Sequence, residues 1–114
     1  MQAADIVFHI TSAKTWEICL TTGQYISDTF ETEGFIHFSG KEQVVATANR
    51  YYQGKKGLLL LQVVVNRLAA KLKYEAAPSG EMFPHLYGPL NLDAVEKVYP
   101  FEPEENGEFV SLPE

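Results

Sequence analysis

The chain has 114 residues, of which 46% are hydrophobic and 21% are charged, a composition typical of one globular domain and not of a disordered segment. Its formal charge of -6 is concentrated at the C-terminus, because residues 102–114 carry five acids and no base. This acidic stretch would repel phosphates, so we expect no nucleic-acid partner.

The first predicted element is a strand over residues 5–11, DIVFHIT, where β-branched and aromatic residues dominate. Alternate side chains of a strand point to opposite faces, so His9 and Thr11 share the face opposite Phe8. The residues before this strand lack the basic and apolar regions of a signal peptide. We therefore expect a cytoplasmic protein.

A helix is predicted over residues 13–21. Thr11 or Ser12 can supply its N-cap, and Gly23 ends it. Its apolar side consists of Trp16, Cys19 and Leu20. Cys19 is the only cysteine, which excludes an internal disulfide and a zinc site built from several thiolates.

The segment from Phe35 to Ser39 predicts a short strand with His37 and Ser39 on one face. Ser39 and Glu42 match the capping box, in which each side chain satisfies a backbone amide of the other residue. A helix is therefore predicted to begin there and to end at Gly54. Its apolar stripe consists of Val44, Val45, Ala48, Tyr51 and Tyr52.

Residues 57–65 are apolar on both faces, which predicts a central strand covered on both sides. This run is far shorter than the ~20 residues of a membrane-spanning helix, so we expect no membrane contact. Residues 71–77 alternate and predict a strand whose wetter face carries Glu75. Helical turns are predicted over 66–70 and 92–94, and a last strand over 95–101.

Residues 81–91, EMFPHLYGPLN, predict a rigid apolar loop, because Pro84 and Pro89 fix φ and Gly88 permits a tight turn. Rigidity is useful where side chains must meet a ligand in one geometry, so His85 and Tyr87 are candidate ligand contacts. The alternative is that His85 bonds backbone groups and simply locks the loop.

Together these elements predict a single α+β domain over residues 1–101, with a mixed, antiparallel-rich sheet and two main helices. Residues 102–114 are predicted to form an acidic C-terminal tail. We expect the protein to be a monomer.

All three histidines lie next to apolar residues, which disfavours the charged ring and leaves a neutral donor and acceptor. Their spacing offers no paired metal ligands on one element, so no metal is expected. Cys19 and Ser39 are explained better as a core residue and a helix cap than as nucleophiles. Glu75 is either a solvated surface residue or a carboxylate that stabilises a developing cation.

The segments FHIT, GFIHFS, KYE and FPHLYGPLNLDAV, in this order, resemble a small bacterial family catalogued as domain of unknown function 952. That family is distantly similar to the ADP-ribosyltransferase fold, a split α+β sheet that holds nicotinamide adenine dinucleotide (NAD) in a cleft. The resemblance implies His9 at the first catalytic position, His37 or Ser39 at the second and Glu75 at the third.

The resemblance further implies a cleft that binds or processes NAD or another ADP-ribosyl or nucleoside-type ligand. His9, His37 and Glu75 would be catalytic, and the ligand-binding residues would be Thr11, Ser39, His85 and Tyr87. Arg50 and Arg67 are the only arginines available for a pyrophosphate, which favours binding over transfer. Non-catalytic ligand binding and protein interaction on the same fold are the alternatives.

Overall fold

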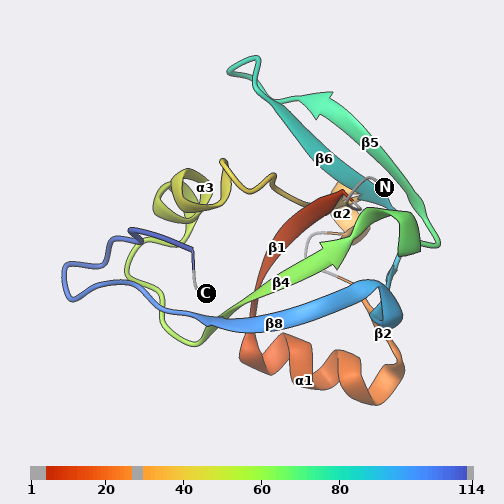
Figure 1. Ribbon diagram of the computed structural model, residues 1–114, viewed down its shortest axis with the longest axis horizontal. Coiled ribbons are helices and arrows are strands. Elements are labelled where there is room, and N and C mark those ends of the chain that lie inside the picture. The colour runs from red at the N-terminus through yellow and green to blue at the C-terminus, as the bar shows by residue number, and fades with distance from the viewer. Residues whose placement is uncertain (1–4, 27–29, 113–114) are drawn as a thin grey trace.

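The computed structural model describes residues 5–26 and 30–112 (Figure 1). The first sheet has the order β1-β4-β8 and contains β1 (Ile6–Ser12), β4 (Leu58–Val64) and β8 (Val95–Phe101). The second has the order β3-β6-β5 and contains β3 (Ile36–His37), β6 (Met82–Tyr87) and β5 (Lys71–Ala76). A two-stranded sheet pairs β2 (Gln24–Tyr25) with β7 (Leu90–Asn91).

The helices are α1 (Ala13–Thr22), α2 (Phe30–Glu33) and α3 (Val44–Tyr51), with 3₁₀ turns η1 (Val65–Arg67) and η2 (Leu92–Ala94). All paired strands among the described residues are antiparallel. Helix α1 and the β3-β6-β5 sheet pack in the core on one face of the β1-β4-β8 sheet, and α3 packs in the core on the other face. The structure confirms the predicted single α+β domain with two main helices.

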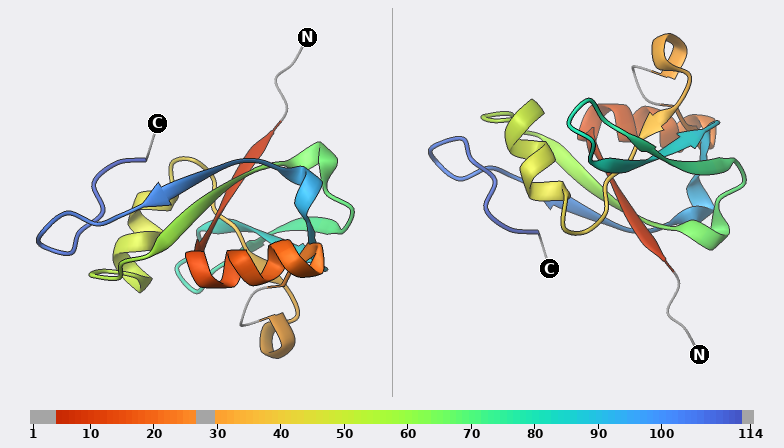
Figure 2. Two further views of the ribbon diagram at one scale, coloured as in Figure 1. Left: turned by 90° about the horizontal axis from the view of Figure 1, so that it is seen from below. Right: turned by 90° about the horizontal axis from the view of Figure 1, so that it is seen from above.

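The two three-stranded sheets meet at one point. Phe8 in β1 and Ser39, which follows β3, form an isolated antiparallel bridge with two backbone hydrogen bonds of 2.8 Å. No further rung joins β1 to β3 in the described part of the chain, so these strands diverge beyond the bridge. Figure 2 shows from two further directions how the second sheet separates from the first. The split lies beside residues 9–12 of β1.

Strand β4 is buried on both faces, as its apolar sequence predicts. The core on one face contains Val7, Cys19, Tyr25, Ile36, Phe38, Leu61, Val63 and Leu86. The core on the other face contains Phe8, Ile10, Val44, Ala48, Leu58, Leu60, Phe101 and Phe109. Neighbouring residues of β1 therefore belong to different cores, which confirms the predicted alternation of its two faces.

Helix α1 begins and ends where its sequence predicts. Ser12 Oγ accepts a hydrogen bond from the Thr15 amide at 3.1 Å, and Gly23, at φ 85°, donates its amide to the Cys19 carbonyl. Only glycine adopts this left-handed conformation at little cost. Cys19 is buried, but Leu20 is exposed, so the prediction was wrong for Leu20. Leu20 points about 100° away from Cys19, outside the narrow stripe that packs.

The predicted capping box at Ser39 is wrong. Helix α3 begins at Val44, and its N-cap residue is Gln43, whose Oε1 accepts a hydrogen bond from the Gly40 amide at 2.8 Å. Ser39 instead pairs its backbone with Phe8 of β1. Ser39 thus pairs with the other sheet and does not cap a helix, and α3 begins several residues later, at Val44.

The predicted loop over residues 81–91 is also wrong, because it contains strands β6 and β7. Pro84 lies inside β6, between β3 and β5, where proline is unusual. In an antiparallel strand the N–H and C=O of a residue point to the same neighbour, and the Pro84 carbonyl accepts from Phe38. The nitrogen of Pro84, which carries no hydrogen, therefore faces Phe38, the residue just beyond the end of β3.

The C-terminal stretch packs on α3. Phe109 is buried, and its ring lies 4.7 Å from that of Phe101. The side-chain amide of Asn49 in α3 donates to the Phe109 carbonyl at 2.8 Å and accepts from the Phe109 amide at 2.7 Å. The stretch treated as a tail in the sequence analysis thus contributes an aromatic side chain to the core. No helix among the described residues is long and apolar enough to cross a membrane.

Candidate functional site

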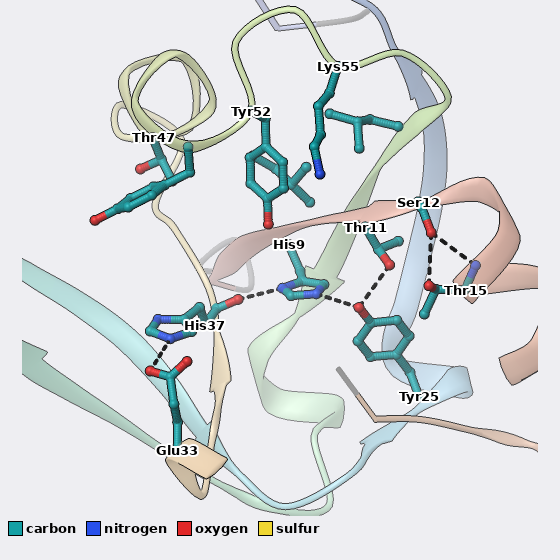
Figure 3. Close-up of a pocket in the computed structure, with 13 residues that line it drawn as sticks. His9, Thr11, Ser12, Thr15, Tyr25, Glu33, His37, Thr47, Tyr52 and Lys55 are labelled. Carbon is teal, nitrogen blue, oxygen red and sulfur yellow. Dashed lines mark hydrogen bonds and ion pairs between the residues drawn. The ribbon is translucent and has the colours of Figure 1, made fainter. Parts of the chain in front are cut away.

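A cavity of about 540 Å³ lies where β1 and β3 diverge (Figure 3). Its volume is within the range of small-molecule binding sites. Strand β1 and the segments near it contribute His9, Ile10, Thr11, Ser12, Thr15, Tyr25, Glu33 and His37. Helix α3 and the chain that follows it contribute Thr47, Tyr51, Tyr52, Lys55 and Leu58.

Three polar side chains form a continuous chain of hydrogen bonds along the β1 wall, which we call the polar relay. His9 Nδ1 donates to the His37 carbonyl at 2.5 Å, and His9 Nε2 lies 2.7 Å from the Tyr25 hydroxyl. That hydroxyl lies 2.8 Å from Thr11 Oγ1. The relay of His9, Tyr25 and Thr11 is buried, so its polar atoms satisfy one another in place of water.

The split between the sheets explains why His9 is held so firmly. Beyond the bridge between Phe8 and Ser39, the His37 carbonyl accepts from the His9 side chain and not from a continued β1–β3 ladder. The ring also packs against Phe38 at 5.3 Å and against Tyr25 at 5.0 Å between centroids. The His9 side chain thus takes the place of a further backbone hydrogen bond between β1 and β3.

Burial also sets the charge of His9. Loss of hydration lowers its pKa from the ordinary 6.5 to about 4, although the bond to the His37 carbonyl opposes this shift. A nearby His37 charge lowers the pKa further. At neutral pH the ring is therefore uncharged, with the proton on Nδ1, the nitrogen that faces the carbonyl.

The opposite wall carries aromatic rings and one cation. Figure 3 shows the Tyr52 hydroxyl and the Lys55 ammonium pointing from the α3 side toward the β1 strand. Tyr51 is 66% exposed, and the Arg50 guanidinium lies 5.5 Å from its ring centroid. A planar ligand group can pack on such a ring, and an anionic group can approach Lys55.

Glu33 and His37 lie where the cavity faces the second sheet. His37 Nε2 donates to Glu33 Oε2 at 2.9 Å, and both side chains are substantially exposed. Among the described residues, Glu33 is the carboxylate that lines the cavity.

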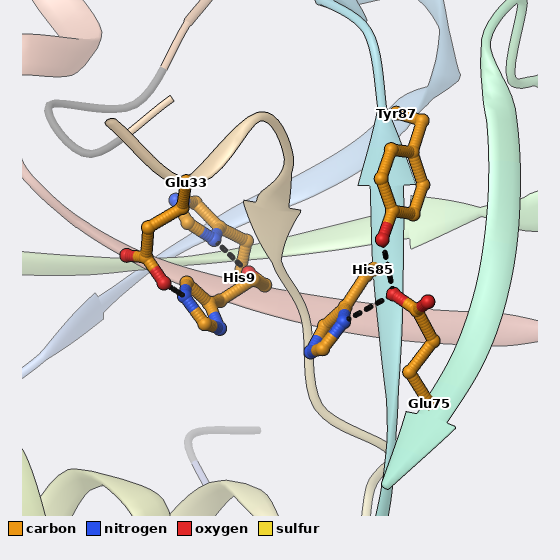
Figure 4. Close-up of polar contacts among 6 residues, drawn as sticks. His9, Glu33, Glu75, His85 and Tyr87 are labelled. Atoms are coloured by element: carbon orange, nitrogen blue, oxygen red, sulfur yellow. Dashed lines mark hydrogen bonds and ion pairs between the residues drawn. The ribbon is translucent and has the colours of Figure 1, made fainter. Parts of the chain in front are cut away.

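A second group of side chains lies on the outer face of the β3-β6-β5 sheet (Figure 4), and we call it the outer cluster. It contains Phe35, Glu75, His85 and Tyr87. His85 Nδ1 donates to Glu75 Oε1 at 2.9 Å, and the Tyr87 hydroxyl donates to the same oxygen. The Phe35 ring stacks on the His85 ring at 4.0 Å and 17°. The strand register explains this group, because β5 and β6 place alternate residues on one face.

The charges of the outer cluster depend on its hydrogen bonds. The bond from Tyr87, and then the bond from His85, lowers the pKa of Glu75. The bond to Glu75 in turn raises the pKa of Tyr87, because the phenol proton is held by the carboxylate. The outer cluster therefore keeps a carboxylate ionised and a phenol protonated.

His37 connects the two groups. Its carbonyl accepts from His9 at the base of the cavity, and its ring lies 5.2 Å from that of His85 in an edge-on arrangement. Cross-strand pairing of His37 with His85 in β3 and β6 produces this contact.

The predicted site residues therefore divide into sets. His9, Thr11 and His37 line the cavity, whereas Glu75, His85 and Tyr87 belong to the outer cluster. Ser39 belongs to neither set; it is buried and holds the bridge to β1. Within the described residues, no group of three or more histidine, cysteine or acidic side chains is placed to hold a metal ion.

Sequence reasoning missed part of the lining, namely Tyr25, Glu33, Tyr51, Tyr52 and Lys55. Tyr25 and Glu33 come from a stretch that reads as a polar connection. Tyr51 and Tyr52 read as the apolar stripe of a helix, although the exposure of Tyr51 shows that it is no core residue. An aromatic pair followed by a lysine at a helix end was the available signal.

Comparisons place the chain among known proteins. The crystal structure of Protein CC0527 from Caulobacter crescentus is 32% identical, with a TM-score of 0.85 over 92% of this chain and 93% of that chain. The solution NMR structure of CC0527 is 33% identical, with a TM-score of 0.80 over 90% of each chain. No curated protein matches the sequence. The family model described as protein of unknown function (DUF952) matches residues 10–98, and the chain belongs to this family.

Proposed function

We propose that the cavity binds a ligand of the nucleoside or ADP-ribosyl type, with NAD as one candidate. The observation that carries this proposal is the contrast between the two walls: a buried, uncharged polar relay faces two tyrosines and a lysine. A sugar hydroxyl suits the relay, a flat base suits the exposed Tyr51 ring, and a phosphate suits Lys55.

The distant resemblance to the ADP-ribosyltransferase fold supports the same ligand class. Members of that superfamily commonly carry a histidine or arginine on the first strand, where it positions a ribose. His9 lies on β1, directly beside the split from β3. The resemblance and the cavity thus point independently to the same part of the chain.

Binding without turnover is the form of this proposal that the arrangement supports best. Glu75, the carboxylate expected to stabilise a ribosyl cation, is bonded to His85 and Tyr87 and does not line the cavity. A transferase reaction would need a carboxylate beside the sugar, and the lining offers Glu33, bonded to His37, in that role.

Calorimetric titration with adenosine, ADP-ribose and NAD tests the proposal. We expect Tyr51→Ala to weaken binding of all three about tenfold, through lost stacking on the base. Lys55→Ala is expected to weaken ADP-ribose about fivefold and to leave adenosine unchanged, because only ADP-ribose brings phosphates.

Lys56→Ala is the matched control, since Lys56 is the next residue, is exposed and does not line the cavity. The sole tryptophan, Trp16, packs 6.5 Å from Tyr25 and offers a fluorescence signal for the same titrations. If wild-type protein binds none of the three probes, the proposed function is wrong.

A further inference from the structure

We propose that the polar relay presents only hydrogen-bond acceptors to the cavity, so the ligand group seated on Thr11 must be a hydrogen-bond donor, a hydroxyl or an amine, and not an anion. This inference rests on the proposed function, because it assigns a polarity to the same site. It follows from counting the protons along the relay.

The direction of the relay is set at its inner end. The His37 carbonyl is an acceptor only, so His9 Nδ1 must carry the proton of the 2.5 Å hydrogen bond. A neutral imidazole has one N–H group, and Nε2 is therefore an acceptor. The ring remains neutral because it is buried, and the described residues place no carboxylate in hydrogen-bond contact with it.

The remaining protons follow in sequence. Nε2 of His9 can only accept, so the Tyr25 hydroxyl uses its single proton in the 2.7 Å hydrogen bond to that nitrogen. Either hydroxyl could donate across the 2.8 Å contact between Tyr25 and Thr11. Because the one Tyr25 proton is already used, the proton of this contact comes from Thr11. A threonine hydroxyl has one proton, so Thr11 Oγ1 keeps only lone pairs for a ligand.

Two other polar parts of the lining, the Ser12–Thr15 pair and Lys55, can donate. Ser12 and Thr15 share one hydrogen bond of 2.8 Å between their hydroxyls, so one of the two protons stays available to a ligand. Lys55 supplies only donors and a positive charge. The ligand is thus oriented with a donor on Thr11 and its anionic group toward Lys55.

Replacement of single ribose hydroxyls in adenosine tests this polarity. Fluorine in place of the 2′- or 3′-hydroxyl removes the donor with little change in size, whereas an uncharged amino group in the same place keeps a donor. We expect one of the two fluoro analogues to bind at least about tenfold more weakly than adenosine, because it leaves Thr11 Oγ1 unpaired. The matching amino analogue is expected to bind within about threefold of adenosine.

Two variants locate the effect. Tyr25→Phe frees the Thr11 proton, so the penalty for the fluoro analogue should fall below about threefold. Thr11→Val removes the acceptor, so adenosine and the fluoro analogue should bind equally weakly. Thr21→Val on the exposed part of α1 is the matched control and should keep the full penalty. Circular dichroism shows whether each variant is folded.

The possible results separate the two proposals. If wild-type protein binds adenosine and both fluoro analogues equally well, the relay does not select a donor and this inference is overturned, while the binding proposal stands. The inference is also overturned if Thr11→Val keeps the full difference between adenosine and the fluoro analogue. If adenosine does not bind to wild-type protein, this inference is overturned, and the binding proposal is overturned only if ADP-ribose and NAD also fail to bind.

Discussion

The polar relay and the outer cluster each contain a histidine and a tyrosine, but the partners of these side chains differ. In the relay, His9 is 7% exposed and its partners are a carbonyl and a hydroxyl. In the outer cluster, the His85 side chain is 12% exposed, and it bonds to the carboxylate of Glu75, whose side chain is 39% exposed. A buried imidazole with neutral partners avoids charge, whereas a carboxylate that reaches water keeps its own charge. The partners of each ring, more than the burial of the ring itself, distinguish the two histidines.

The comparison separates two roles. Removing one partner from the relay leaves a buried polar atom unpaired, so the relay is expected to contribute strongly to stability. The outer cluster lies near water, which can replace a lost partner, so its contribution is expected to be small. The relay also lines the cavity, and the outer cluster does not.

The largest expected effect is a loss of stability in acid that depends on His9. The pKa of His9 is about 4 in the folded protein and 6.5 in the unfolded chain, so the unfolded chain binds a proton first as pH falls. The free energy of unfolding should therefore fall by about 3 kcal/mol as pH falls through the range from 6.5 to 4, and the loss from this group should level off below pH 4.

Urea denaturation across this pH range measures the effect, and His9→Gln provides the comparison because it removes the titrating group. The other two histidines remain in both proteins, so the difference between the two pH profiles isolates His9. Parallel profiles would contradict the assignment of a neutral, buried ring to His9.

A smaller effect is expected from removing single tyrosine hydroxyls. Tyr25→Phe strands His9 Nε2 in the core and should lower the free energy of unfolding by about 2 kcal/mol. Tyr87→Phe removes an exposed hydroxyl from Glu75 and should change stability much less. Thermal and urea unfolding of both variants measure the difference, and equal losses would contradict the assigned roles.

His85→Ala tests whether the outer cluster locks the sheet or meets the ligand. The His85 side chain is 12% exposed and stacks on Phe35, so its loss should cost about 1 kcal/mol of stability. Adenosine affinity of the folded variant should stay unchanged, because His85 does not line the cavity. A tenfold loss of affinity with unchanged stability would move the ligand to the outer cluster.

The smallest expected effect is a change in the titration of Tyr87. Glu75 raises the pKa of Tyr87 by accepting its proton, so Glu75→Gln should lower the Tyr87 pKa toward its ordinary value. Difference absorbance at alkaline pH follows the phenol, with Tyr87→Phe identifying its contribution. An unchanged titration in Glu75→Gln would show that the carboxylate does not hold this proton.

Local periodicity predicts much of the fold. Alternation in β1 places His9 and Thr11 on one face, because side chains of a strand repeat every two residues. The largely apolar run of β4 predicts a central strand, and Ser12 and Gly23 predict the ends of α1. Each of these features depends only on residues that are close together in the sequence.

Features that depend on distant partners were not predictable. Pro84 lies in β6 opposite the end of β3, and Ser39 pairs its backbone with Phe8 instead of capping a helix. Tyr25 reaches His9 because β2, which pairs with the distant β7, places it there. Sequence reasoning therefore identifies His9 and His37 of the cavity but not the partners that set their chemistry.

Mapping of backbone amide shifts by NMR during titration with ADP-ribose tests the central claim most directly. We expect the largest changes in residues 9–12 of β1 and residues 47–55 in and after α3, which form the two walls of the cavity. Residues 75–87, which carry most of the outer cluster, should change little. Changes concentrated in residues 75–87, with residues 9–12 unperturbed, would contradict the assignment of the ligand to the cavity beside the polar relay.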